Sequence, residues 1–278
     1  MLALGFDIGG TNLKSIFWKD GQIKQKSIDS LPKDLPSLLD LIKDIFDECS
    51  ESFGRPQKVG IATAALVDKK GKIILAPNIP YLNGKNLLEK IKRCTGMKKI
   101  TACHDSHAFL RAELDLNKKI KSKNILFVAL GTGIGGAFTV NGRLIEDTEN
   151  WPGEVGKAVL DLRTGRTLEQ LGGSQFLKSS LKVKSIMEAK IKAVSGDSKA
   201  LIAFEKMGAN LGVGLAGAVN LLGSDTVVLG GGLIETKKFW LQFFKRSFKA
   251  NLIGPKKSKT KIIISVNGIF GGAIGSII

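Results

Sequence analysis

The stretch ILFVALGTGIGGAFTV, Ile125 to Val140, decides how the rest of the chain is interpreted. Apolar and β-branched residues run into a glycine-rich segment, and a second apolar run follows it, which predicts two strands joined by a turn. Glycine has no Cβ, so the N–H groups of such a turn can approach a ligand and form a concavity that suits phosphate oxygens. The candidate phosphate contacts are Gly131, Thr132, Gly133 and Gly135.

The N-terminus repeats this pattern. In LGFDIGGTNLKSIFW, Leu4 to Trp18, two apolar runs flank a second glycine-containing turn. Two such units predict a duplicated fold with one phosphate turn in each half, which together can hold the phosphates of one nucleotide across a cleft. The candidate nucleotide contacts of the first half are Gly9, Gly10, Thr11, Asn12 and Lys14.

Asp7 ends the first predicted strand, directly before these glycines. A carboxylate in this place is suited to hold Mg²⁺ through water, because Mg²⁺ keeps much of its hydration when it binds to proteins. The alternative is an aspartate that only caps the turn.

Length and composition narrow the class of protein. The 278 residues are enough for two domains, and the chain has no apolar run of transmembrane length and no basic segment before an apolar one. Three scattered cysteines argue against a disulfide framework and fit a reduced cytoplasm. The net charge of +17 fits either a polyanionic partner or a solvated, lysine-rich surface. Motifs for nucleic-acid binding are missing, so we expect no nucleic-acid or membrane partner.

Polar residues follow the predicted strand Lys99 to Cys103 in the order His104, Asp105, Ser106, His107, and a helix follows from Ala108 to Leu116. The carboxyl end of a strand is where α/β folds place ligands. Asp105 is therefore a candidate site residue, with a plain helix N-cap as the alternative. The two histidines lack the further ligands that a metal pair needs.

Hydrophobic periodicity predicts the other elements. Helices are expected over 35–46, 86–92, 174–194, 198–221, 237–250 and the last residues of the chain, and strands over 2–8, 14–19, 22–28, 59–65, 226–229 and 261–266. The glycine-rich end of the helix over 198–221 indicates close packing against another element. Gly230, Gly231 and Gly232 follow a buried strand, where they can take an adenine or ribose or simply make a tight strand–helix connection.

Taken in order, these motifs resemble those of the ROK family of sugar kinases in the actin and hexokinase fold superfamily. The resemblance rests on DIGGTN at Asp7–Asn12, LGTGIGG at Leu130–Gly136, GAVNLL at Gly217–Leu222 and VVLGGG at Val227–Gly232, and it covers nearly the whole chain. It implies an α/β fold of two actin/hexokinase-like (ribonuclease H-like) domains with a cleft between them. We expect a smaller domain over 1–105 and a larger one over 106–278, with a terminal helix at about 271–278 packing back on the first.

The resemblance also implies roles for residues at the sugar end. His104-Asp105 stands where the family has Asn-Asp, which makes Asp105 the general base. Glu154-Val155-Gly156-Lys157 stands for Glu-x-Gly-His, and Glu169 matches a sugar-contacting glutamate. The expected sugar-binding residues are Asn78, His104, Asp105, Glu154, Lys157 and Glu169.

Many family members hold a structural zinc with that histidine and a cysteine-rich segment downstream. Here Lys157 replaces the histidine, and residues 161–169 contain no cysteine. A protonated lysine is no zinc ligand, so the expectation is ATP and Mg²⁺ but no zinc. No N-terminal DNA-binding segment is present, which favours a kinase over a ROK repressor.

The sequence is compatible with three functions. The first is ATP-dependent phosphorylation of the 6-hydroxyl of a hexose, glucose or a close relative, in the cytoplasm. The second is a polyphosphate-dependent glucokinase, since such relatives also lack the zinc cysteines and the charge of +17 suits a polyanion. The third is a non-catalytic sugar- or nucleotide-binding protein, motivated by His104 and Lys157. A homodimer is left open, because family members are often dimers.

Overall fold

The structure is a computed structural model that describes residues 1–68, 70–146 and 152–278. The chain divides into two compact units, each with its own sheet. The first contains Met1–Asn117, a short segment that begins at Glu146, and Ile269–Ile278; the second contains Lys118–Ile145 and Pro152–Gly268. Helix α3 (Asp105–Leu116) thus lies in the first unit. The predicted domain boundary after residue 105 stays a prediction.

The sheet of the first unit has the order β3-β2-β1-β4-β7. Its strands are β1 (Leu2–Ile8), β2 (Asn12–Lys19), β3 (Gln22–Ser30), β4 (Lys58–Thr63) and β7 (Ile100–His104). β1, β2 and β3 are joined as an antiparallel meander, whereas β4 pairs parallel to β1 and β7 parallel to β4. The carboxyl ends of β1, β4 and β7 therefore meet at one edge of the sheet.

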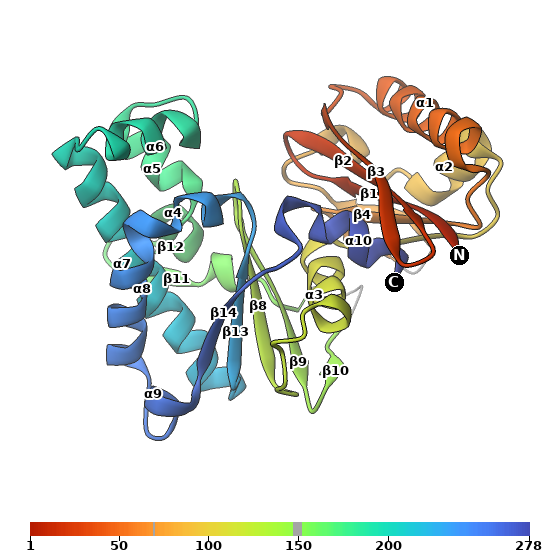
Figure 1. The fold of residues 1–278 in the computed structure, drawn as a ribbon. Helices are drawn as coiled ribbons and strands as arrows, with labels where there is room; N and C mark the ends of the chain where they lie inside the picture. Colours follow the sequence, from red (N-terminus) through yellow and green to blue (C-terminus); the bar gives the residue numbers. More distant parts are fainter. Residues whose placement is uncertain (69, 147–151) are drawn as a thin grey trace. The chain divides into compact units, whose positions relative to one another are not determined.

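The sheet of the second unit repeats this topology, in the order β10-β9-β8-β13-β14 (Figure 1). Its strands are β8 (Ile125–Leu130), β9 (Ile134–Val140), β10 (Arg143–Leu144), β13 (Thr226–Gly230) and β14 (Lys261–Ile264). β9 pairs antiparallel with β8 and β10, and β13 lies parallel to both β8 and β14. The predicted duplication is therefore confirmed by strand order as well as by motif.

Two small antiparallel pairs lie outside these sheets. The first joins β5 (Leu66–Val67) to β6 (Ile73–Leu75), and the second joins β11 (Val159–Asp161) to β12 (Arg166–Thr167). The second pair belongs to the segment that carries the expected sugar-binding residues of the second unit.

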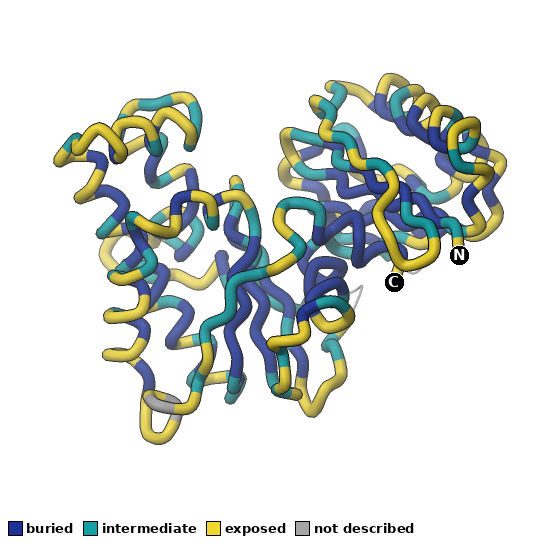
Figure 2. The backbone as a smooth tube through the Cα atoms, in the orientation of Figure 1, coloured by how far each residue is buried: buried dark blue, intermediate teal, exposed yellow. Residues whose placement is uncertain are grey.

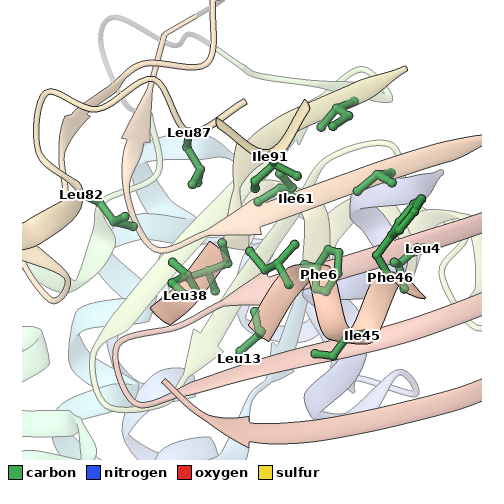
Figure 3. Packing of buried hydrophobic residues seen from close by; sticks show 14 of the residues in the cluster. Leu4, Phe6, Leu13, Leu38, Ile45, Phe46, Ile61, Leu82, Leu87 and Ile91 are labelled. Atoms are coloured by element: carbon green, nitrogen blue, oxygen red, sulfur yellow. The ribbon is translucent and has the colours of Figure 1, made fainter. Parts of the chain in front are cut away.

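One face of the first sheet is covered by α1 (Leu35–Phe53) and α2 (Leu87–Thr95). Apolar residues at helical spacing on α1 meet alternate residues of β1, so both elements bury one side. Figure 3 shows Leu38 and Phe46 of α1 lying with Phe6 of β1 in this core. Figure 2 shows the central strands β1 and β4 as largely buried and the outer side of α1 as exposed, whereas the edge strand β3 is exposed or half-buried along its length.

The opposite face is covered by α3 and by the C-terminal helix α10 (Gly271–Ile277). This helix approaches so closely that side chains would not fit between the backbones. A Cβ on Gly5 would lie 2.2 Å from the Ala273 carbonyl oxygen, and one on Gly60 would lie 2.1 Å from that of Ser276. The glycines in the strands are therefore what lets α10 pack on the first sheet.

The helices of the second unit pack on its sheet around one apolar cluster. They are α4 (Leu168–Gly172), α5 (Ser174–Leu181), α6 (Ile186–Val194), α7 (Ser198–Leu222) and α8 (Lys237–Asn251). A short helix, α9 (Lys256–Lys259), follows α8 along the chain. Two of them, α7 and α8, contact each other through glycines, since a Cβ on Gly208 would lie 2.4 Å from the Trp240 carbonyl oxygen. This confirms the close packing expected for the glycine-rich helix.

Two expectations about helices were wrong. The predicted single helix over 174–194 is interrupted, because Lys182 adopts a left-handed backbone (φ 52°) after α5 and the Ser185 side chain caps α6. The helix expected from Ala108 begins earlier, so that Asp105 is its first residue and His104 occupies the N-cap position. Asp105 therefore does not act as the N-cap. Across the described residues, no helix has the length and apolar character needed to cross a membrane.

The packing of α10 gives a stability prediction. Gly275→Ala should lower the free energy of unfolding by about 1–3 kcal/mol or more, the cost typical of overpacking, because the new Cβ would lie 1.6 Å from the Ala108 carbonyl oxygen. Gly217→Ala on an exposed part of α7 is the matched control, since its Cβ would meet no atom within 4 Å. The control should gain about 0.5–1 kcal/mol. Urea unfolding followed by circular dichroism measures both; equal stability of the two variants would contradict the packing.

Candidate active site

Asp7 and Lys14 form a buried ion pair beside the first glycine turn. They face each other in the β1/β2 register, and the Lys14 ammonium donates to the Asp7 carboxylate over 2.9 Å. The Asp7 side chain is 3% exposed and that of Lys14 19%. Burial raises the pKa of the Asp7 carboxyl above its usual value, although the charge of Lys14 lowers it in part and that of Asp105 raises it further.

Asp105 lies at the carboxyl end of β7, as the first residue of α3. Its Oδ1 accepts from the Ser106 N–H over 2.6 Å, and the side chain is 26% exposed. A carboxylate in the first turn of a helix is stabilised by the free N–H groups there. Burial nevertheless raises the pKa of Asp105, and the Ser106 hydrogen bond and the charge of Lys14 offset only part of the shift. The result is a carboxylate of raised basicity that solvent still reaches.

His104 is neutral at physiological pH, because burial lowers its pKa to about 4. Its Nδ1 lies 2.7 Å from the Ser106 hydroxyl and 3.3 Å from Asp105 Oδ1. The imidazole therefore contributes hydrogen-bonding capacity beside Asp105 rather than charge. Ser106 was not among the predicted site residues, and no sequence signal separates it from an ordinary serine at a helix start.

The first glycine turn is closed by its own backbone. Gly9 donates to the Asn12 carbonyl oxygen over 3.0 Å, while Gly10 and Thr11 lie exposed. A Cβ on Gly10 would lie 2.8 Å from the Cβ of Asn78, which places the loop of Asn78 against this turn. The structure thus brings the predicted residue Asn78 to the predicted nucleotide turn of the same unit.

The second glycine turn is held by a carboxylate that comes from elsewhere in the sequence. Gly131 donates to the Gly133 carbonyl oxygen over 3.0 Å, and the Ile134 N–H donates to Glu169 Oε2 over 2.8 Å. A Cβ on Gly133 would lie 2.4 Å from the same Glu169 oxygen. A side chain at Gly133 would therefore displace the Glu169 carboxylate from this position, so the glycine leaves room for the contact in addition to any role toward a phosphate.

Lys157 pairs with the other oxygen of Glu169. Its ammonium donates to Oε1 over 2.9 Å, with the lysine side chain 57% and the glutamate 26% exposed. The sequence does not say which acidic group Lys157 pairs with, and the geometry shows that it is Glu169. An exposed pair of this kind contributes at most about 1 kcal/mol, so it orients the carboxylate more than it stabilises the fold.

Glycines also fix the segment that carries Glu154 and Lys157. A Cβ on Gly136 would lie 2.5 Å from the Gly153 carbonyl oxygen, and one on Gly156 would lie 2.2 Å from that of Ile134. The short helix η2 (Val155–Lys157) thus packs backbone to backbone on β9. Gly136 serves this packing, and Glu154 is half-buried at the start of η2.

The three glycines after β13 have different roles. Gly231 has a φ of 88°, and a Cβ there would lie 2.4 Å from the Leu130 carbonyl oxygen at the end of β8. Gly230 is confined by the Phe127 ring, whereas Gly232 is exposed and has open space where a Cβ would be. Two of the glycines therefore meet the needs of the strand–helix connection, and Gly232 is the one with room for a ligand.

Mg²⁺ fits these residues only through Asp7. Mg²⁺ is commonly held by one or two carboxylates, waters and substrate phosphates, and one oxygen of Asp7 is already bound by Lys14. The described residues contain no group of three or more His, Cys, Asp or Glu side chains arranged to hold a metal ion. Asp7 can thus support a water-mediated ion that arrives with the phosphates.

Comparison with known proteins extends these observations. A sequence model of the ROK family matches residues 3–278. The N-acetyl-D-glucosamine kinase of Photobacterium profundum is 25% identical over 300 residues, covering 98% of this chain and 97% of that protein. The resemblance inferred from the motifs is therefore confirmed over almost the whole chain.

Solved structures show the same fold. A ROK family glucokinase from Streptomyces griseus, in complex with glucose and AMPPNP, matches with a TM-score of 0.85 at 22% identity, over 100% of this chain and 98% of that one. The ROK hexokinase from Thermus thermophilus matches with a TM-score of 0.81 at 22% identity, over 100% and 97% of the two chains. The predicted α/β fold of the actin and hexokinase type is confirmed.

The contact between Glu169 and the second turn can be tested without an activity assay. Glu169→Ala should speed hydrogen exchange at the Ile134 amide, because the acceptor is lost, whereas Glu169→Gln keeps an oxygen acceptor and should preserve protection. Exchange resolved by NMR measures both variants. Glu188→Ala, which removes the acceptor for Ser185 in α6, is the control that should leave Ile134 unchanged. Equal exchange at Ile134 in all three variants would contradict the contact.

Proposed function

The chain is a sugar kinase of the ROK family, and we propose that it transfers the terminal phosphoryl group of ATP to the 6-hydroxyl of a hexose. The observation that carries this proposal is Asp105, a carboxylate of raised pKa that remains accessible to solvent at the carboxyl end of β7. In direct phosphoryl transfer the protein forms no covalent bond to the substrate, so it needs mainly to position the two substrates and to supply one base for the sugar hydroxyl.

Asp105 is proposed as the general base. Its carboxylate accepts the proton of the 6-hydroxyl as that oxygen forms a bond to the γ-phosphorus of ATP and the bond to the β–γ bridging oxygen breaks. A base whose pKa is raised toward the working pH holds the proton more strongly, which favours its transfer. Neutral His104 and the Ser106 N–H keep the Asp105 carboxylate oriented.

The phosphates are proposed to lie on the two glycine turns. The exposed N–H groups and hydroxyls of Gly10, Thr11 and Thr132 offer donors, and Lys14 offers a cation beside the first turn. Mg²⁺ bound to the phosphates would neutralise charge as the terminal group leaves, with Asp7 holding it through water. Gly232 is proposed to adjoin the adenosine.

The sugar is proposed to contact Asn78, His104, Glu154 and Glu169. Lys157 already pairs with Glu169, so the lysine does not require an acidic substituent on the substrate as its partner. A neutral hexose fits this better than a sugar acid. Glucose and N-acetylglucosamine are the two acceptors we propose, since the relatives compared above are named for them or as hexokinases.

A steady-state assay of glucose, N-acetylglucosamine and mannose, with ATP or polyphosphate as donor, tests the function. We expect ATP to phosphorylate one of these hexoses, and Asp105→Asn to lower kcat by at least ~10²-fold, the usual lower scale for a positioned acid–base group. Asp115→Asn, an exposed carboxylate on the same helix, is the control and should keep activity. Polyphosphate as the better donor would favour a polyphosphate glucokinase. Tight sugar binding without turnover under either donor would favour a binding protein.

The raised pKa of Asp105 predicts the acid limb of the pH profile. The base works only when ionised, so kcat should fall as pH falls through a pKa above the ordinary 3.8, rather than at it. His104 is already neutral above about pH 4, so His104→Asn should keep the position of this limb. Direct detection of sugar phosphate between pH 4.5 and 8.5 avoids the limits of coupling enzymes. An acid limb that stays unchanged in Asp105→Asn would remove Asp105 from the role of base.

A further inference from the structure

The second unit contains a cavity that the proposed reaction does not use. Its volume is about 590 Å³, within the usual range for small-molecule sites. It lies between α7 on one side and α4 and α5 on the other. It is lined by Arg166, Leu171, Phe176, Ser180, Lys199, Ile202, Ala203, Lys206, Ala209 and Asn210.

The polar lining of this cavity is cationic. Arg166, Lys199 and Lys206 contribute three positive charges, and no lining residue carries a carboxylate. Lys199 and Lys206 are two helical turns apart, which places both on the same face of α7. Among the described residues, no carboxylate lies within ion-pair distance of either lysine. All three cations are solvent-exposed, and the carboxylates of Asp197 and Asp161 interact electrostatically with Lys199 and Arg166. The net positive charge of the lining still favours an anion.

The remaining lining is apolar enough to bind more than an inorganic anion. The half-buried ring of Phe176 and the side chain of Ile202, which is 51% exposed, lie among the lining residues with two alanines. Burying an apolar surface against these side chains would be favourable, and an inorganic phosphate offers no such surface.

The lining also carries hydrogen-bonding groups, which are the Ser180 hydroxyl, the Asn210 amide and the Arg166 guanidinium. Asn210 donates its side-chain amide to the Leu171 carbonyl oxygen over 3.0 Å, which fixes the amide and presents its own carbonyl oxygen as an acceptor. The Arg166 guanidinium donates to the Gln170 carbonyl oxygen over 3.1 Å and retains further N–H donors. The cavity thus offers the Asn210 carbonyl oxygen as an acceptor, the Phe176 ring as an aromatic surface and the Arg166 guanidinium as a cation with several N–H donors.

We propose that this cavity is a second nucleotide site, separate from the glycine turns. The base lies on Phe176 and Ile202, its exocyclic amine donates to Asn210, and the phosphate contacts Lys199, Lys206 and Arg166. None of the residues that line the cavity belongs to the glycine turns or is Glu169, Lys157 or Gly232. The ligand class is a nucleoside mono- or diphosphate, and AMP is the probe of choice because it lacks a transferable phosphoryl group.

The test measures AMP binding by isothermal titration calorimetry while the donor site is saturated with AMPPNP and Mg²⁺. We expect one AMP to bind per chain. Lys199→Glu and Lys206→Glu should each weaken binding about tenfold or more, since a hydrogen bond to a charged group is worth about 1.5–3 kcal/mol and tenfold equals 1.4 kcal/mol. Lys249→Glu on an exposed part of α8 makes the same charge change elsewhere and should leave AMP affinity within about twofold. Circular dichroism and sugar-kinase activity establish that the variants are folded.

A second variant separates nucleotide recognition from simple anion binding. Ile202→Ser should weaken AMP several-fold while leaving the weaker binding of pyrophosphate unchanged, because only AMP covers the apolar lining. Absence of AMP binding beside AMPPNP would overturn the proposal, as would AMP binding that ignores Lys199→Glu and Lys206→Glu. Pyrophosphate binding as tightly as AMP would reduce the cavity to an anion patch. A change of oligomeric state in Ile202→Ser, seen by sedimentation, would assign this face to another copy of the chain instead.

Discussion

The buried ion pair between Asp7 and Lys14 is the interaction on which the first unit depends. A carboxylate that is 3% exposed needs a partner, and Lys14 supplies it from the neighbouring strand at the position directly opposite. Removing one partner from such a pair leaves a charge without compensation, which is usually far costlier than the pair is worth. Helix α10 accommodates this arrangement, because Gly272 lies where a Cβ would come within 2.8 Å of the Asp7 carboxyl carbon. Lys14 of the same pair also lowers the pKa of Asp105 in part, against the larger effect of burial.

In the second unit, backbone contacts take the place of a buried charge. Carbonyl oxygens fill the space that side chains would need at Gly136, Gly156 and Gly231, and Glu169 links the glycine turn to η2. The two sheets share one strand order, yet the strand ends of the first carry Asp7 and Asp105, whose pKa values burial has raised. Such shifts are typical of catalytic sites. This difference is consistent with our proposal that the first unit supplies the base and the second unit helps to hold the phosphates.

The amino-acid sequence was enough to predict the duplicated α/β fold, the two glycine turns and the placement of Asp105 after a strand. These are local patterns: alternation, glycine clusters and strand ends are legible within a window of about a dozen residues. Even there, the break between α5 and α6 was missed, because a left-handed Lys182 has no signature comparable to glycine. The choice of Asp105 over a plain cap came from resemblance, and its role as base stays a prediction.

Which side chains contact each other follows from the folded structure and not from the motifs. Glu169 contacts Ile134 across 35 positions of sequence, and Lys157 selects Glu169 over Glu154 through distances that no motif contains. The same holds for the pKa of about 4 at His104, because desolvation depends on everything packed around the ring. The cavity between α5 and α7 likewise brings Arg166 to Lys199 and Lys206 from separate elements. Long-range contacts and burial are properties of the folded chain. The sequence therefore predicts the motifs, but not the contacts that orient their side chains and shift their pKa values.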